Sequence, residues 1–344
     1  MEKTIAWIKT DETNGFSRMI DQTIIPYEYK KVDIKTSKDM YDAIKTMIVR
    51  GAPAIGIAGA HGVVLGAIEN IDSLDFINDV KKVANYLDSS RPTAVNLHWA
   101  LQKQIEILEE NKNKSNKEII KLLIENAIKL EDEDIEINKK IGKYGSEIIP
   151  KGATILTHCN AGALATVGWG TALGVVRSAF EKDKTIKVFA DETRPRQQGA
   201  RLTTYELTRD GIDTTLITDG MGAYFMSKKM IDVVVTGADR IALNGDSANK
   251  IGTYMVAIAA KYHNIPFYIA APKSTIDPAI KSGEEIVIEL RNKEEVTIIN
   301  NKPICTDKVN VINPGFDVTP SNLITGIITE YGIFKPNEIY KLFE

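Results

Sequence analysis

The sequence has few residues of the types that form disulfides or bind transition metals: two cysteines and four histidines among 344 residues. Cys159 and Cys305 lie far apart in the chain, which argues against a secreted disulfide framework and for a reducing compartment. The histidines show no ligand spacing such as H-E-x-x-H, and no cysteine pair accompanies them. We therefore expect no metal site, and we expect each histidine to serve in packing or hydrogen bonding.

The sequence also lacks an excess of charge of one sign, since its formal net charge is -3. No general attraction to nucleic acid or to an anionic membrane is expected, so an anionic substrate must be held by a few placed cations and backbone N–H groups. The start of the chain has no apolar core of signal-peptide length. The longest apolar stretch, 52–68, is broken by glycines and His61, which predicts a buried helix rather than a membrane span. We predict a cytoplasmic protein.

Hydrophobic periodicity divides the N-terminal half into a short β region followed by helices. The first thirty-five residues alternate apolar and polar positions, which is typical of short strands. From Ser37 onward the apolar residues fall at helical spacing. The spacing predicts further helices near 53–69, 74–88, 92–110 and 117–147.

After residue 150 the pattern changes to short apolar runs that alternate with helices. The runs are Ala153–Thr157, Ile186–Ala190, Thr215–Thr218, Val233–Thr236 and Pro266–Ala270. Such runs are typical of a parallel sheet covered by helices on both faces. Beyond about residue 286 we expect two more strands and a helix near Pro320–Tyr331. The prediction is an α/β protein with a mainly helical N-terminal domain (1–148, with a small β start) and a Rossmann-like parallel-sheet C-terminal domain (149–344).

Polar residues follow four of these predicted strands. Cys159 follows the first, and Asp191, Asp219 and Asp239 follow the second, third and fourth. Because ligands bind outside the carboxyl ends of open parallel sheets, these groups predict a rim suited to acid–base chemistry. A single aspartate at a strand end is more often a turn residue or a helix cap, and a lone cysteine is about as often a buried small residue as a reactive group. His158 precedes Cys159 on a strand, so its side chain should point away from that of Cys159.

The loops indicate an anionic substrate rather than a dinucleotide cofactor. The G-x-G-x-x-G turn of nicotinamide enzymes is missing after the first strand, where the chain reads Cys-Asn-Ala-Gly-Ala-Leu (159–164). Three helix starts carry cations: Arg50-Gly51-Ala52-Pro53, Arg91-Pro92-Thr93 and Asn249-Lys250. Helix N-termini attract anions through free N–H groups and the helix dipole. Ordinary capping remains an alternative for any one of them.

At these same stretches the sequence resembles the methylthioribose-1-phosphate isomerase family, which is related to the regulatory subunits of the translation-initiation guanine-nucleotide exchange factor. The similarity runs over essentially the whole chain. Its motifs are RGAPAIGIAGA (50–60), RPTAVNLHWA (91–100), THCNAGALATVGWGTALGVVRSA (157–179), ADETRPRQQGARLTTYEL (190–207), the stretch 236–277 from TGADR to KSTID, and NPGFDVTP (313–320).

The resemblance implies a cofactor-free aldose–ketose isomerase and a homodimer. The reaction would convert 5-methylthioribose 1-phosphate to 5-methylthioribulose 1-phosphate in methionine salvage. Cys159 would stabilise the transition state and Asp239 would donate a proton. Substrate contacts would come from Arg50, Gly51, Ala52, Arg91, Gln198, Asn249 and Lys250. The family gives no role to Asp219, which is then a turn residue, and leaves Asp191 as a candidate supporting residue.

This substrate is phosphorylated on its anomeric oxygen, so its ring cannot open by loss of a hydroxyl proton. An acid must help the ring oxygen leave C1, and we hypothesise that Asp239 is held protonated by the apolar surroundings that Val233–Val235 suggest. Hydrogen then moves from C2 to C1, either through an enediol with Cys159 as proton carrier or as a hydride shift beside Cys159. The sequence leaves both routes open.

Several positions depart from the family pattern, among them His98, Trp169, 196–198, Thr204-Tyr205 and 289–291. These departures leave undetermined which 5-substituent the substrate pocket accepts. Alternative substrates are therefore 5-deoxyribose 1-phosphate and, more distantly, ribose 1,5-bisphosphate. A non-catalytic subunit that senses a phosphorylated ligand is the alternative from another functional class.

Overall fold

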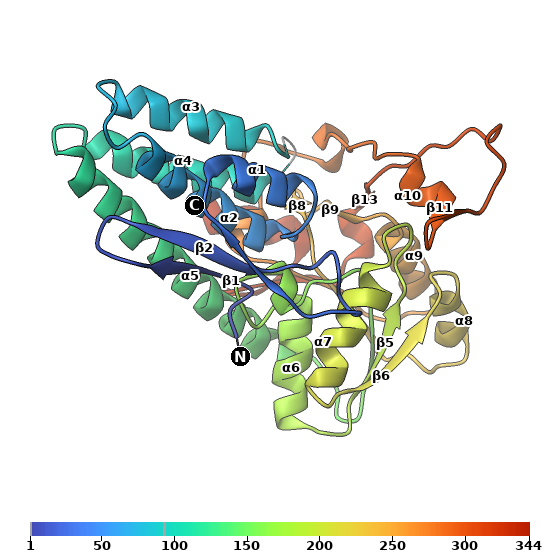
Figure 1. Cartoon of the computed structure of the whole chain (residues 1–344). Coiled ribbons are helices and arrows are strands. Elements are labelled where there is room, and N and C mark those ends of the chain that lie inside the picture. Colours follow the sequence, from blue (N-terminus) through green and yellow to red (C-terminus); the bar gives the residue numbers. More distant parts are fainter. Residues whose placement is uncertain (1, 92–93) are drawn as a thin grey trace. The chain divides into compact units, whose positions relative to one another are not determined.

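A computed structural model describes residues 2–91 and 94–344, and its chain forms two compact units (Figure 1). The first unit contains Met1–Lys140 and Ala161–Gly174, and the second contains Ile141–Asn160 and Val175–Glu344. The chain therefore passes from one unit to the other three times. The domain boundary that the sequence pattern indicates between residues 148 and 149 stays a prediction, because it concerns which part of the chain folds independently.

The first unit is a small antiparallel sheet with a set of helices, as the sequence predicts. Its strands run in the order β1-β2-β3. The elements are β1 (Ile5–Lys9), β2 (Gly15–Ile20), β3 (Lys31–Ile34), α1 (Ser37–Lys45), α2 (Ala52–Glu69), α3 (Phe76–Asp88), α4 (Val95–Glu110) and most of α5 (Asn116–Ser146), whose residues from Ile141 onward belong to the second unit. The expected start of a helix at residue 92 falls on 92–93, outside the described residues.

The core of the first unit is built around α2. Its window of 18 residues has a mean hydropathy of 1.4, and 83% of it is buried inside the fold. By length and composition it is the one helix in the described chain that could span a membrane. A helix that is apolar on all sides is typical of a protein core. The neighbouring helix α3 approaches α2 closely at Gly66. A Cβ atom there would lie 2.4 Å from the side chain of Val83 on α3.

The second unit contains a seven-stranded sheet in the order β15-β14-β10-β7-β4-β5-β6. All pairs are parallel except β14 with β15. The strands are β4 (Thr154–Thr157), β5 (Lys187–Asp191), β6 (Asp213–Ile217), β7 (Val233–Thr236), β10 (Phe267–Ala270), β14 (Gly326–Thr329) and β15 (Gly332–Phe334). The predicted parallel sheet is confirmed. The strand order reverses between β4 and β7, as in doubly wound folds.

Helices connect these strands, and shorter strands between them in the sequence form two smaller sheets. The connecting helices are α6 (Ala172–Lys182), α7 (Thr204–Arg209), α8 (Met221–Ser227) and α9 (Thr253–Tyr262). A second, antiparallel sheet joins β8 (Arg240–Ile241), β9 (Ser247–Lys250) and β13 (Phe316–Thr319). The remaining α-helix and strands are α10 (Glu294–Thr297), β11 (Ile298–Ile299) and β12 (Lys302–Pro303), and a 3-10 helix at Pro336–Phe343 ends the chain's regular structure. Val233, Ile269 and Ile327 are completely buried within the larger sheet.

The predicted helix near Pro320–Tyr331 is wrong. A single 3-10 turn occupies Ser321–Leu323, and β14 follows it. Ile327 and Ile328 are β-branched and fully buried, and they pair in parallel with Ile269 and Ala270 of β10. Such residues pack well on a pleated sheet, so tertiary pairing decides the conformation of this segment.

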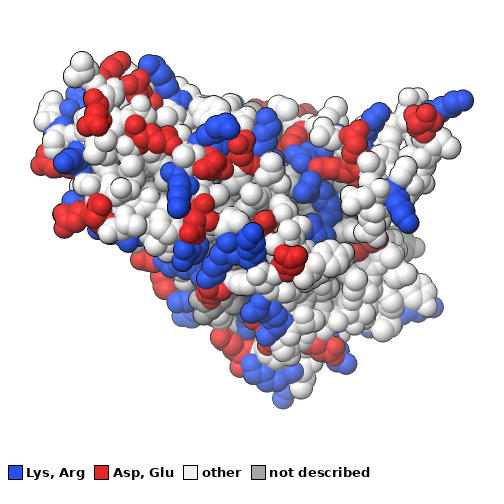
Figure 2. All heavy atoms as spheres, viewed as in Figure 1, with Lys and Arg blue, Asp and Glu red and all other residues white. Residues whose placement is uncertain are grey.

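Charged side chains of both signs are interspersed over the face drawn in Figure 2. This distribution agrees with the small net charge of -3. It offers a polyanion no broad basic surface on that face.

Candidate active site

Two of the candidate residues follow the central strands β4 and β7, which flank the point where the strand order reverses. Leu156 of β4 pairs with Val234 of β7. Cys159 comes two residues after the end of β4, and Asp239 three residues after the end of β7. Ligands of open parallel sheets bind at this reversal, outside the carboxyl ends of the strands. The topology therefore brings the loops that carry the cysteine and the aspartate to one edge of the sheet.

Cys159 is held in an unusual backbone conformation. Its φ angle is 66°, in the left-handed region that non-glycine residues rarely adopt, and its side chain is largely buried. The backbone N–H of Cys159 donates to Oγ1 of Thr193 (2.8 Å), and its carbonyl oxygen accepts from Oγ1 of Thr203 (2.6 Å). Two hydroxyl groups thus fix the peptide groups on either side of the thiol. Strain of this kind persists only where the surroundings impose it.

The loop that follows β5 is anchored in turn by Asp219, which follows β6. Its carboxylate accepts the backbone N–H groups of Thr193 (2.8 Å) and Arg194 (2.7 Å). Gly199 packs so closely on the end of β5 that a Cβ atom would lie 1.7 Å from the carbonyl oxygen of Asp191. Asp219 therefore does more than shape its own turn: it holds the loop that holds Cys159.

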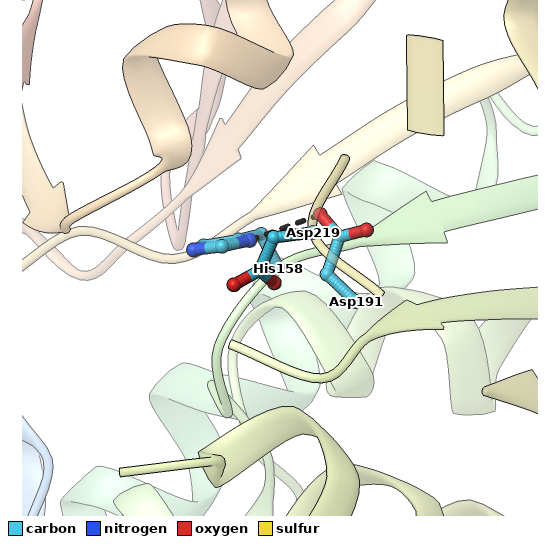
Figure 3. A group of neighbouring side chains, drawn as sticks. All are labelled: His158, Asp191 and Asp219. Carbon is cyan, nitrogen blue, oxygen red and sulfur yellow. Dashed lines mark hydrogen bonds and ion pairs between the residues drawn. The ribbon is translucent and has the colours of Figure 1, made fainter. Parts of the chain in front are cut away.

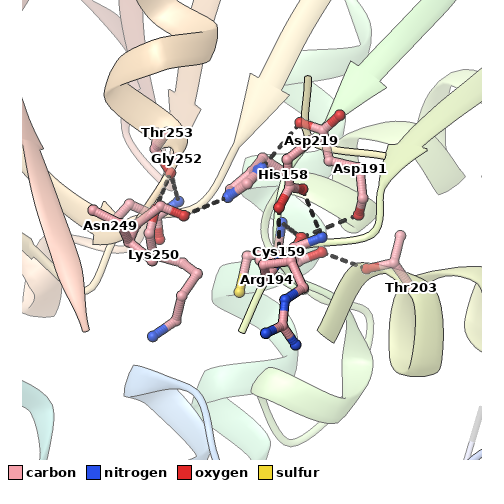
Figure 4. A network of polar contacts seen from close by, with 12 residues as sticks. His158, Cys159, Asp191, Arg194, Thr203, Asp219, Asn249, Lys250, Gly252 and Thr253 are labelled. Carbon is pink, nitrogen blue, oxygen red and sulfur yellow. Dashed lines mark hydrogen bonds and ion pairs between the residues drawn. The ribbon is translucent and has the colours of Figure 1, made fainter. Parts of the chain in front are cut away.

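Asn249 and Lys250 end β9, and α9 begins only at Thr253, after Gly252 with a φ angle of 104°. The expected place at a helix start is therefore wrong, because antiparallel pairing with β13 keeps both residues extended. Nζ of Lys250 donates to the carbonyl oxygen of Gly315 (2.6 Å). Nδ2 of Asn249 donates to Oγ1 of Thr253 (3.0 Å). Figure 4 shows Sγ of Cys159, Nζ of Lys250 and the guanidinium of Arg194 directed to the same side of the polar network.

Gln198 and Asp239 complete the candidate residues of the second unit. Gln198 is 5% exposed, and its Oε1 atom is buried without a hydrogen-bond partner among the described residues. A buried amide oxygen in that state is suited to accept a hydrogen bond from a ligand. Asp239 is half-buried and lies beyond the buried run Val233–Val235, and its backbone N–H donates to Ala248 of β9 (2.9 Å).

The first unit holds the remaining candidates. Gly51 is the N-cap of α2, with a φ angle of 95°, and Pro53 lies in the first turn. Arg50 and Gly51 are half-buried, and Ala52 is buried. The cap has no side chain to satisfy the first N–H groups of α2, which leaves them suited to an anion. Arg91 lies in the turn between α3 and α4, next to the two undescribed residues. This turn contributes a second cation to the same unit.

One group in the described part of the chain has the composition of a metal site: His158, Asp191 and Asp219, whose ligand atoms lie within 4.8 Å of one another (Figure 3). Hydrogen bonds within the protein involve each of these atoms except Oδ1 of Asp191, which is buried without a partner among the described residues. Nδ1 of His158 is 2.9 Å from Oδ2 of Asp191, and its Nε2 is 2.9 Å from the carbonyl oxygen of Ile251. Since the oxygens of Asp219 accept two backbone N–H groups, we interpret the group as a hydrogen-bonded charge cluster. Sequence reasoning missed its extent, although it placed Asp191 and Asp219 at the rim.

The chain matches the model of the initiation factor 2 subunit family over residues 48–336. The methylthioribose-1-phosphate isomerase of Caldicellulosiruptor saccharolyticus is 55% identical over 318 residues, covering 92% of this chain and 93% of the relative. The Thermotoga maritima protein of the same name is 54% identical over 329 residues, 95% of each chain.

Two solved structures share the whole architecture. The 5-methylthioribose 1-phosphate isomerase of Pyrococcus horikoshii OT3 is 42% identical with a TM-score of 0.88, covering 100% of this chain and 96% of that one. A structure from A. fulgidus described as translation initiation factor eIF-2B, subunit delta, is 44% identical with a TM-score of 0.85, covering 99% and 100%. The chain thus belongs to the initiation factor 2 subunit family, in the branch that contains proteins named methylthioribose-1-phosphate isomerase.

Proposed function

We propose that this protein is an aldose–ketose isomerase that converts 5-methylthioribose 1-phosphate to 5-methylthioribulose 1-phosphate in methionine salvage. The observation that carries the proposal is the 55% identity to a methylthioribose-1-phosphate isomerase over nearly the full length of both chains. The rim of the sheet supports it independently. A thiol and a carboxyl group follow the two strands that flank the reversal of strand order, where an α/β sheet binds small ligands.

The reaction opens the ring and then moves one hydrogen from C2 to C1. Asp239 donates a proton to the ring oxygen as the bond between that oxygen and C1 breaks. In the hydride route, the C2 hydrogen moves to C1 with its electron pair, and the 2-hydroxyl loses its proton as C2 becomes a carbonyl. In the enediol route, a base takes the C2 proton, a C1–C2 double bond forms, and C1 is reprotonated as the 2-hydroxyl loses its proton. Cys159 lies beside the reacting carbons in both.

The binding residues divide the recognition of a sugar phosphate between charge and hydrogen bonds. Lys250, Arg50 and Arg91 supply cations, and the N-terminus of α2 at Gly51 and Ala52 supplies backbone N–H groups. Gln198 offers its buried amide oxygen to a sugar hydroxyl, and Asn249 a side-chain amide. A few placed donors suffice for one phosphate in a protein with a net charge of -3.

The decisive experiment is turnover of the purified protein on three sugars, followed by NMR. These are 5-methylthioribose 1-phosphate, 5-deoxyribose 1-phosphate and ribose 1,5-bisphosphate. A ketose product formed fastest from the first establishes the proposal. Faster turnover of either other sugar assigns the enzyme a different substrate, and no product from any sugar rejects the isomerase.

The 44% identity to a structure described as a translation initiation factor subunit supports one further candidate, a regulatory subunit that binds a phosphorylated ligand. Such a subunit would bind one of the three sugars without forming a ketose. Binding measured by calorimetry beside the turnover assay separates the two functions.

We also infer that the protein works as a homodimer in the cytoplasm. Large apolar side chains of β6, α8, α9 and the residues after α8 are exposed, and we call them the α8–α9 surface. Its members are Leu216, Met221, Tyr224, Met230, Tyr254, Met255, Ile258 and Tyr262, each at least 40% exposed. Exposed apolar side chains gathered on packed helices are typical of interfaces between copies of a chain.

A further inference from the structure

His158 is completely buried, and each of its ring nitrogens faces an acceptor (Figure 4). Nε2 lies 2.9 Å from the carbonyl oxygen of Ile251, which can only accept, so Nε2 carries a proton. Nδ1 lies 2.9 Å from Oδ2 of Asp191, whose side chain is also inaccessible to solvent. With an ionised Asp191, both nitrogens donate and the ring is an imidazolium.

Three carboxylates surround this ring, from three different elements. Asp191 ends β5, Asp219 follows β6, and Asp317 lies in β13. Burial raises the pKa of Asp191 and the pKa of Asp317, and the positive charge of His158 opposes both rises. Lys250 is a further cation near Asp317. A cation on His158 therefore compensates a group of carboxylates that would otherwise repel one another.

Each of the other two carboxylates also holds a loop. Asp219 accepts from the N–H groups of Thr193 and Arg194, and Asp317 accepts from those of Gly252 (2.7 Å) and Tyr254 (3.1 Å). Burial disfavours the charged form of His158, but the hydrogen bond and the charge of Asp191, with the charge of Asp219, outweigh it. The pKa of His158 is raised above its ordinary value as a result.

The position of His158 connects two parts of the candidate site. It directly precedes Cys159, and its Nε2 partner, Ile251, directly follows Lys250. The backbone of Gly252 closes over the ring, where a Cβ atom would lie 2.8 Å from Cε1. One side chain thus spans from the cysteine loop to the segment that follows β9.

We propose that His158 is a positioning residue that stays cationic through Asp191 and holds Cys159 in register with Asn249 and Lys250. This inference rests on the proposed isomerase function. His158 itself touches no reacting atom: it acts through the two backbone segments that it joins.

The charge is tested on the free protein by ¹⁵N NMR of the four imidazole rings, with His158→Gln identifying the signals. We expect both ring nitrogens of His158 to stay protonated from about pH 5.5 to pH 8, well above the ordinary pKa of a histidine side chain at the upper end of this range. Asp191→Asn should return His158 to a neutral ring. A neutral His158 in the unmodified protein at pH 8 would overturn the proposal.

The positioning role is tested by kinetics of His158→Gln and Asp191→Asn. We expect kcat to fall about 100-fold in both, since displacement of a reacting group by about 1 Å costs that much, and KM to rise through the Lys250 segment. The matched control is His61→Gln, which also removes a buried histidine from a carboxylate (Nε2 to Oε1 of Glu131, 3.0 Å), but in the first unit. It should lower the melting temperature and keep kcat per folded molecule.

Equal losses of kcat in His61→Gln and His158→Gln, or an unchanged kcat in folded His158→Gln, would overturn the positioning role. Absence of turnover in the unmodified protein would reject the isomerase function instead. In that case the NMR experiment still decides whether His158 is charged.

Discussion

Nδ1 of His158 lies 2.9 Å from Oδ2 of Asp191, in a pair that solvent does not reach. The register of the sheet places them there. Thr157 of β4 pairs with Ala190 of β5, so the next residues of the two strands, His158 and Asp191, lie side by side at the carboxyl edge. The carboxyl edge of this sheet therefore carries a buried pair of ionisable groups directly next to the candidate residue Cys159.

Replacing either proposed catalytic group should abolish turnover and leave the fold intact. For Cys159→Ser and Asp239→Asn we expect kcat to fall by about 10² to 10⁴, the usual contribution of a positioned acid or base. Substrate affinity, measured by calorimetry, should change little. Cys305→Ser is the control, because this exposed cysteine lies outside the candidate site. Full activity in Asp239→Asn would remove the aspartate from the mechanism.

Adding one methyl group at Gly51 should damage the anion site of the first unit. The Cβ atom would lie 2.5 Å from Ala165, and the φ angle of 95° disfavours any side chain. We expect Gly51→Ala to raise KM at least tenfold as the start of α2 shifts. Gly211→Ala is the matched control, because Gly211 also has a positive φ angle (74°) with nothing within 4 Å of its Cβ position. A KM in Gly51→Ala no higher than in Gly211→Ala would contradict an anion site at the start of α2.

Stability should depend on pH through Asp134 of α5. Burial raises the pKa of Asp134 to about 7, although its carboxylate accepts the N–H of Val167 (2.7 Å). The folded protein then binds more protons at this group than the unfolded chain, so the free energy of unfolding falls as the pH rises from about 4 to about 7. Asp134→Asn removes this slope, which is on the order of 4 kcal/mol over three pH units.

Thermal unfolding at pH 5 and pH 8 measures this effect. The asparagine variant should gain stability relative to the unmodified protein at pH 8. Asp132→Asn serves as a control, since its exposed carboxylate contacts only the surface residue Lys3 in the ion pairs of the described chain. The same pH slope in both variants would refute the assignment to Asp134.

A lysine in the α8–α9 surface should separate the proposed dimer. Ile258 is 45% exposed on α9, and a buried lysine at a symmetric interface would place two like charges close together. Ile258→Lys should therefore sediment as a monomer at micromolar concentration. Leu74→Lys, at an exposed apolar residue of the first unit, should leave the mass unchanged. An unmodified protein that is already monomeric would contradict the homodimer.

Local patterns of apolar residues predicted most of this fold, because the residues that form these patterns are also the ones buried in the folded protein. The five apolar runs after residue 150 all form strands of one sheet, and the mainly apolar stretch 52–68 forms the core helix of the first unit. The helix expected near Pro320–Tyr331 was wrong because parallel pairing with β10 decides the conformation of Gly326–Thr329. That partner lies more than fifty residues away in sequence, beyond the reach of any local pattern.

The site was predictable where its residues end strands, and less so where they act through others. Cys159, Asp191 and Asp219 could be placed at the rim from the strand runs alone. The contact between His158 and Asp191 could have been predicted, because each residue follows one of two strands expected to be neighbours. The second contact of His158, to the carbonyl oxygen of Ile251, depends on the path of the chain between β9 and α9. No spacing in the sequence predicts that path.

The three crossings of the chain between the two units have a consequence for gene architecture. Val167 donates to Asp134, and Gln22 donates to the carbonyl oxygen of Leu164, so residues 161–174 satisfy polar groups of the first unit. A fragment that stops at residue 140 lacks that segment, and one that runs to residue 174 carries part of the sheet of the second unit. No single cut of the gene therefore separates the units, and recombination at one point cannot exchange either of them between relatives.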